Sequence, residues 1–160
     1  MLALEPLSAQ DTTDNILVYG TIKEYFYGRR LPEALVVVKE NGVVKKEIAP
    51  DLAGQYAFYL DFDADFSVHF SMNGMVTKYA LINTKDIPIE DRFGGFAMNV
   101  DMTLFDMFEG FDVSILDGPI GISKFDSSSK TLEWDYEYTE VIQDSLRSIF
   151  DQFEEQENDQ

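Results

Sequence analysis

The sequence predicts an all-β protein: a seven-stranded antiparallel β-sandwich, followed by a C-terminal extension with a hairpin and one amphipathic helix. Seven short segments alternate apolar and polar residues, which is the period of a strand with one buried face. Turn signals separate these segments about every 8–12 residues, and two of them are Asn-Gly pairs, which favour tight hairpins because both residues accept positive φ. Two antiparallel sheets packed face to face would bury all of these strands.

Each predicted strand is bounded by residues that favour a turn or a strand end. The strands cover residues 16–23, 34–38, 43–49, 54–60, 66–72, 77–83 and 96–104. Pro32 suits the start of the second strand, because proline lacks an N–H and fixes its own φ. The alternation assigns an inward face to five strands and leaves the face of residues 77–83 open. The inward residues are Val18, Gly20, Ile22, Ala34, Val36, Val38, Tyr56, Phe58, Leu60, Phe66, Val68, Phe70, Met72, Phe96, Met98, Val100, Met102 and Leu104.

Glycine, proline and aromatic residues recur in a fixed order in the first half of the chain. They are Gly20 in the first strand, then Gly28, Leu31, Pro32, Ala34 and Val36, then Asp51, Gly54 and Tyr56. This order resembles the carboxypeptidase regulatory-like domain, a transthyretin-like β-sandwich, over residues 15–104. One departure is the aromatic insert, residues 25–27, where the family has a short polar turn.

The resemblance implies a non-catalytic module that works outside the cytoplasm. The segments LINTKDIP…GGFAMNVDMTLF and FDVSILDGPIG…WDYEYT are similar to small cell-envelope proteins of Bacteroidota-type bacteria. The resemblance therefore implies the periplasm or the cell surface of a Gram-negative bacterium, with no enzyme activity and no cofactor. Residues 1–14 are interpreted as a signal-peptide remnant, because LSAQ resembles a cleavage site, or else as a disordered N-terminus.

The charge of the chain argues against several classes of partner. The net charge is −18, which repels nucleic acid and anionic membrane surfaces. No stretch approaches the ~20 apolar residues of a transmembrane helix, and the absence of cysteine excludes disulfides and thiolate metal sites. Residues 1–105 hold 9 Lys and Arg against 15 Asp and Glu, whereas residues 106–160 hold 3 against 15. This change in net charge along the chain predicts a sandwich over 15–105, an acidic extension over 106–153 and a disordered acidic tail over 154–160.

The extension contains the residues predicted to bind a partner. A hairpin is predicted where DSSSK separates GISKF from TLEWD, and the apolar period then becomes helical. The helical stripe consists of Tyr138, Ile142, Leu146, Ile149, Phe150 and Phe153. A helix of this length is marginal alone in water, so the stripe must pack either on its own sandwich or on a partner. Leu35 and Val37 point away from the predicted core and offer part of a second apolar patch.

Few residues are candidates for chemistry. His69 is the only histidine and is predicted to face solvent, with an ordinary pKa. Asp61, Asp63 and Asp65 are spaced like calcium ligands, but the glycine and distal glutamate of a helix–loop–helix calcium site are missing. Five aromatic residues could stack on a sugar or cover an open sheet edge. They are Tyr19, Tyr25, Phe26, Tyr27 and Tyr59.

Together these features predict a non-catalytic β-sandwich module that mediates protein–protein interaction within an envelope assembly. The predicted partner is an envelope protein with a basic surface, which would attract the acidic extension. The alternative is a carbohydrate- or calcium-binding module. No catalytic residue is predicted in either case.

Overall fold

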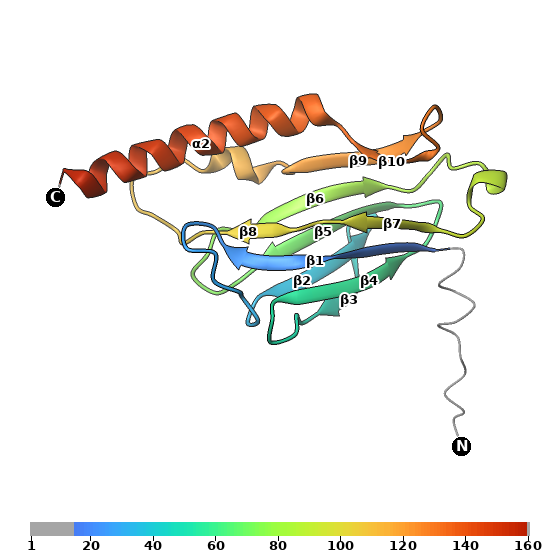
Figure 1. Cartoon of the computed structure of the whole chain (residues 1–160), viewed down its shortest axis with the longest axis horizontal. Helices are drawn as coiled ribbons and strands as arrows, with labels where there is room; N and C mark the ends of the chain where they lie inside the picture. Colours follow the sequence, from blue (N-terminus) through green and yellow to red (C-terminus); the bar gives the residue numbers. More distant parts are fainter. Residues whose placement is uncertain (1–14, 160) are drawn as a thin grey trace, which may run out of the picture.

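The computed structural model describes residues 15–159 as two packed β-sheets with a long helix along one side (Figure 1). The strands are β1 (Ile16–Glu24), β2 (Leu35–Glu40), β3 (Val43–Ile48), β4 (Gln55–Leu60), β5 (Asp65–Ser71), β6 (Lys78–Asn83), β7 (Phe96–Asn99), β8 (Met102–Leu104), β9 (Gly121–Asp126) and β10 (Thr131–Trp134). The helices are the 3-10 turns η1 (Ile89–Asp91) and η2 (Ser114–Asp117) and the α-helix α2 (Tyr136–Asn158). The signal-peptide interpretation concerns residues outside this range.

The two sheets differ from the prediction in strand number and direction. One sheet has the order β4-β1-β7, with β8 also paired to β1, and the other has the order β10-β9-β6-β5-β2-β3. Strand β1 pairs in parallel with β7 and β8, and β6 pairs in parallel with β9. The predicted β-sandwich is therefore confirmed, but its seven antiparallel strands are wrong: the described residues form ten strands, and three pairings are parallel.

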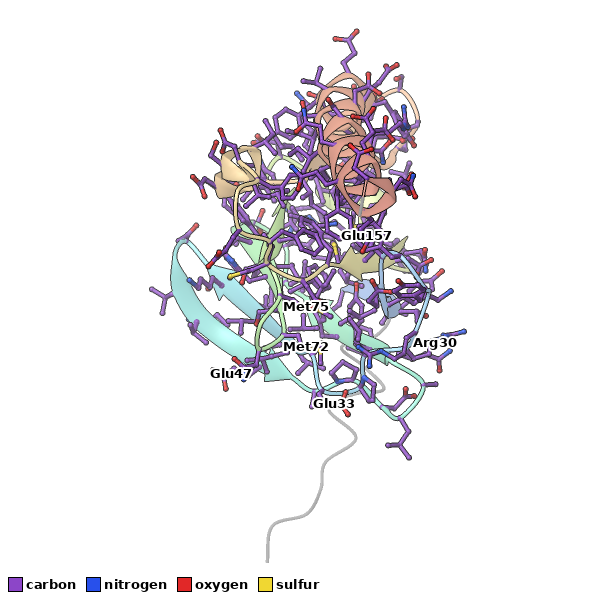
Figure 2. The ribbon with its side chains drawn as sticks, turned by 90° about the vertical axis from the view of Figure 1, so that its left-hand side faces the viewer. Arg30, Glu33, Glu47, Met72, Met75 and Glu157 are labelled. Carbon is purple, nitrogen blue, oxygen red and sulfur yellow. The ribbon has the colours of Figure 1, made fainter. Side chains whose placement is uncertain are left out.

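The predicted inward faces are confirmed in the centre of the sandwich. Val36, Val38, Phe58, Val68 and Phe70 are all buried between the sheets. Their burial follows from the period of two, which sends alternate side chains to one face. Figure 2 views the molecule end-on, with Met75 among the side chains that fill the space between the two layers and α2 above them. The open prediction for β6 is settled as well, since Lys78, Ala80 and Ile82 are its buried residues.

The Asp51, Gly54 and Tyr56 pattern builds the turn that leads into β4. The Asp51 carboxylate accepts hydrogen bonds from the backbone N–H groups of Ala53 and Gln55, both at 2.9 Å. Gly54 has φ of +75°, which a residue with a Cβ rarely adopts. The Tyr56 hydroxyl then donates to the carbonyl oxygen of Val100, and burial raises the pKa of that hydroxyl so that it stays a donor.

A local irregularity at Val100 and Asp101 divides the predicted strand 96–104 into β7 and β8. Opposite it lies Gly20, where a Cβ atom would come within 2.1 Å of the Val100 carbonyl oxygen. The backbone N–H of Thr21 donates to Oδ1 of Asp101 at 2.9 Å, in place of a regular strand-to-strand bond. The close approach of the Val100 carbonyl to Gly20 therefore explains why the strand is interrupted here. The inward alternation nevertheless continues from β7 into β8.

The C-terminal extension is part of the sandwich rather than an appendage. The predicted hairpin forms as β9 and β10, and β9 pairs with β6, so the boundary at residue 105 runs through the six-stranded sheet. Leu132 belongs to the main core, and Phe125 and Trp134 pack against it. The reason is that β6 would otherwise be an edge strand with unpaired backbone groups, which the hairpin satisfies.

Helix α2 extends further toward the C-terminus than expected. The Asp135 side chain accepts a hydrogen bond from the N–H of Tyr138 and caps its first turn at 3.0 Å. The helix continues to Asn158, so the expected disorder is wrong for residues 154–158. Phe153 packs on Phe108 and anchors the preceding turn, and the Glu- and Gln-rich end has good helix propensity. No helix within residues 15–159 is long and apolar enough to cross a membrane.

Gly20→Ala should destabilise the protein by about 1–3 kcal/mol or more, because the added Cβ overlaps the Val100 carbonyl and forces the β7–β8 junction to shift. Urea denaturation measures this change. Gly118→Ala is the matched control, since its Cβ would lie 3.6 Å from the Tyr138 hydroxyl, an ordinary contact. A Gly20→Ala protein as stable as the control would contradict the proposed constraint.

Candidate functional site

The apolar stripe of α2 packs on the chain's own sandwich. Ile142, Leu146 and Phe150 are buried in a second core, together with Val76 and Phe105. Tyr138, Ile149 and Phe153 are half-buried at its margins. The stripe is therefore not a free surface, and the partner-binding role predicted for these six residues does not hold in this structure. Leu35 and Val37, which were predicted to offer part of a second apolar patch, do not belong to the second core that α2 contacts.

Aromatic rings from two segments, one after β1 and one after β8, hold the C-terminal half of α2. The aromatic cluster comprises Tyr25, Phe26, Phe105, Phe108, Phe111, Phe150 and Phe153. The Phe150 ring lies 4.1 Å from Tyr25 and 4.9 Å from Phe105, measured between centroids. The Glu24 carboxylate shapes the first segment by accepting the N–H groups of Phe26 (2.9 Å) and Tyr27 (2.6 Å). The aromatic insert, which departs from the family pattern, is thus a contact surface for the helix.

The aromatic residues proposed to bind a sugar do not form one platform. Tyr25 and Phe26 belong to the aromatic cluster, and Tyr27 beside them is 89% exposed. Tyr19 and Tyr59 instead lie on the outer face of the four-stranded sheet, on β1 and β4. Because a sugar-binding platform needs adjacent rings in one plane, this arrangement does not favour the carbohydrate alternative.

Two of the three aspartates proposed as calcium ligands pair with cationic side chains. Arg92 binds both carboxylate oxygens of Asp63, at 2.6 and 3.0 Å, and these hydrogen bonds hold the pKa of Asp63 below its usual value. Lys85 pairs with Asp65 at 2.6 Å. Across residues 15–159 no three His, Cys, Asp or Glu side chains are grouped to hold a metal ion. This arrangement does not favour the calcium alternative, because neighbouring cations already pair with two of the three carboxylates.

His69 faces outward as predicted but is half-buried. Its ring stacks on Tyr79 with centroids 4.9 Å apart, and its Nε2 lies 2.9 Å from the Ser67 hydroxyl. Burial, followed by the charge of nearby Lys39, lowers the pKa of His69, which corrects the prediction of an ordinary pKa.

His69 belongs to an apolar face that no sequence pattern identified completely. The face lies on the solvent side of the six-stranded sheet and is called the outer face below. Register places Val37, His69 and Tyr79 in one row across β2, β5 and β6, and Leu81 and Ile122 beside each other on β6 and β9. Leu35, at the end of β2, is 37% exposed. The outer face consists of Leu35, Val37, His69, Tyr79, Leu81 and Ile122.

A cavity of about 300 Å³ lies between α2 and the sandwich, and its most unusual wall residue is Lys78. Lys78 is only 4% exposed, and within residues 15–159 its ammonium has no ion pair and no hydrogen bond. It lies 5.4 Å from the centre of the Phe105 ring, an attractive cation–π distance. Burial lowers the pKa of Lys78 to about 8. Sequence analysis missed this residue because the face of β6 was left open.

Two further charged residues line the same cavity. Asp101 is placed there by the β7–β8 junction and its bond with Thr21, and Arg147 comes from α2. The remaining wall is mixed: Met102, Ile142 and Leu146 are apolar, whereas Thr103, Thr139 and Gln143 are polar. The site thus combines a buried cation with both apolar and polar wall residues.

Comparisons with known proteins assign neither a family nor a function to this chain. No protein-family model and no curated protein matches the chain. Similar solved structures include a protein of unknown function and proposed membrane association from Bacteroides fragilis (14% identity, TM-score 0.42), the Bacillus anthracis TIE protein (15%, 0.46) and catechol 1,2-dioxygenase from Acinetobacter sp. ADP1 (18%, 0.44). They cover 61, 58 and 67% of this chain, which spans only 30, 17 and 57% of theirs. At these TM-scores the likeness carries no argument, so the carboxypeptidase regulatory-like resemblance stays a prediction.

Replacing both Ile142 and Leu146 by Asp should lower the melting temperature sharply, because both side chains are buried in the second core. We expect a loss of at least about 3 kcal/mol from the apolar burial alone. Thermal unfolding followed by circular dichroism tests this. Val141→Asp is the control on the same helix, since Val141 is 62% exposed and should tolerate the charge. Equal melting temperatures for both variants would show that the stripe is not core.

Lys78→Met should stabilise the protein at pH 7, by roughly 3 kcal/mol at most, because it removes a buried charge whose pKa falls from 10.5 to about 8 on folding. Between these two values the unfolded chain binds more protons than the folded one, so wild-type stability gains from rising pH. The advantage of Lys78→Met should therefore be complete below about pH 8 and shrink as the pH approaches 10.5. Urea denaturation of both proteins at pH 7 and pH 10 measures the difference.

Exposed Lys124→Met is the control for this comparison and should show no such pH-dependent difference from the wild type. A Lys78→Met protein that is less stable than wild type at pH 7, or whose advantage does not change with pH, would show that the buried ammonium is compensated.

Proposed function

We propose that this protein is a non-catalytic module of the carboxypeptidase regulatory-like type that binds another protein in a cell-envelope assembly. Its place would be the periplasm or the cell surface of a Gram-negative bacterium. The observation that carries the proposal is the outer face of the six-stranded sheet, where apolar side chains of β2, β6 and β9 face solvent. This surface replaces the helical stripe as the partner-binding site.

The apolar side chains of the outer face cannot be buried in the chain's own core. Leu35, Val37 and Leu81 occupy the outward positions of their strands, and the period of two keeps them on the side opposite the core. The helix that could have covered them packs elsewhere, on Val76 and Phe105. Ser67 and Ser71 on β5 add polar groups among the apolar ones. An apolar centre with polar groups around it is the usual composition of a non-obligate protein interface.

Charge supports a partner with a basic surface. The exposed side of α2 is strongly acidic, and Arg147 is the one basic residue between Tyr136 and Asn158. Its exposed acids include Glu137, Glu140, Asp144, Asp151, Glu154, Glu155 and Glu157. With a net charge of −18, the molecule should attract a basic partner from a distance, and association should slow as salt screens this field.

Val37→Lys combined with Leu81→Lys should abolish partner binding, because the lysines remove apolar contact and repel a basic surface. Both positions are partly exposed, so the folded state should remain. The measurement is copurification of a discrete partner from envelope fractions of the native organism after mild crosslinking, with melting curves of the purified variants.

The matched control is Ala57→Lys with Ala97→Lys, two exposed positions on the outer side of the four-stranded sheet. This control adds the same charge and should retain the partner. Retention of the partner by the Val37 and Leu81 variant, or its equal loss from the control, would overturn the proposed site.

A further inference from the structure

We propose that the cavity beneath α2 is a binding site for a small organic monoanion, a carboxylate with a compact apolar body, and that Lys78 pairs with the carboxylate. This site lies between the helix and the sandwich, with Lys78 on β6, Asp101 at the β7–β8 junction and Arg147 on α2. It is separate from the outer face, so it does not depend on the proposed protein partner.

The first argument is the state of the Lys78 ammonium. A lysine carries three N–H donors and no acceptor, and burying it without a partner costs free energy. Phe105 offers its ring at 5.4 Å, which offsets part of the charge but cannot satisfy three directional donors. Among residues 15–159 no carboxylate comes within ion-pair distance of it. The Lys78 nitrogen is not fully enclosed, so an anion entering the cavity could reach it and supply both a countercharge and acceptors.

The second argument is the shape and polarity of the cavity. Its volume of about 300 Å³ is at the lower end of the range for small-molecule sites. Met102, Ile142, Leu146 and Phe150 give it apolar walls, and all four side chains are buried. These four side chains can hold an apolar body of limited size, such as a single aromatic ring or a short alkyl chain, which an inorganic ion lacks.

The third argument is the pairing of the charged residues that line the cavity. Arg147 already pairs with Asp144 at 3.2 Å on the exposed side of α2, so Lys78 is the one of the two lining cations without a carboxylate partner. Asp101 is held in place by the backbone N–H of Thr21, so its carboxylate stays beside the cavity. A ligand with one negative charge can pair with Lys78, whereas a second negative charge would meet Asp101 and be repelled.

Benzoate tests the proposal against benzamide, which has the same ring and no charge. The full chain is labelled with ¹³C at its methionine methyl groups and titrated with each compound by NMR. Benzoate should shift the Met102 signal with saturation, while Met75, which is buried but does not line the cavity, should stay unchanged. Benzamide should bind at least about tenfold more weakly, because it cannot pair with the ammonium. Equal shifts with the two compounds, or none with benzoate, would overturn the proposal without any substitution.

The Lys78→Met variant then tests whether the Lys78 ammonium is the group that pairs with the carboxylate of benzoate. This variant keeps the apolar stem and should lose at least about tenfold in benzoate affinity while its other methionine signals show a native fold. Lys124→Met, an exposed lysine on β9, is the matched control and should bind benzoate like the wild type. Unchanged benzoate binding in a folded Lys78→Met protein would show that Lys78 does not hold the anion.

Discussion

Burial of the α2 stripe against the sandwich is the interaction on which the rest of the molecule depends. Phe150 contacts rings from the segment after β1 and from the segment after β8, so one side chain connects residues more than 100 positions apart. This contact brings the acidic extension back onto the sheets. It also leaves the solvent side of the six-stranded sheet uncovered, because the only long helix of the described residues is occupied elsewhere (Figure 1).

The position of the helix also creates the cavity. Helix α2 and the β7–β8 junction face each other across it, and neither would line a cavity without the other. The junction exists because Gly20 lets the Val100 carbonyl approach and because the backbone N–H of Thr21 donates a hydrogen bond to the Asp101 carboxylate. A lysine on the inner side of β6 thereby faces an enclosed space instead of solvent. A buried cation in such a place lowers stability, which is typical of residues retained for binding.

The two proposed surfaces serve different kinds of recognition. The outer face lies on four neighbouring strands, β2, β5, β6 and β9, whose other sides pack in the core, which suits a protein partner. The cavity is small and lies under a helix that is anchored mainly at its C-terminal half by the aromatic cluster. A ligand in the cavity would contact α2 directly and would add to the interactions that hold it on the sandwich.

The sequence by itself determined the position of most strands, the inward faces of five of them, the Asn41-Gly42 hairpin and the existence of an amphipathic helix. These features follow from local periods and turn residues, which act over a few positions. The turn before β4 could also be predicted from Asp51, Gly54 and Tyr56, because each of these residues shapes the same short turn.

Only the tertiary structure decided where the helix packs, which strands pair in parallel and what faces Lys78. The stripe could bury itself on this chain or on another one, and its spacing is the same in both cases. The parallel pairing of β9 with β6 joins residues about 40 positions apart, and no local signal encodes such a contact. The calcium-like spacing of Asp61, Asp63 and Asp65 was misleading for the same reason, since the cations that pair with two of them, Lys85 and Arg92, come from a distant loop.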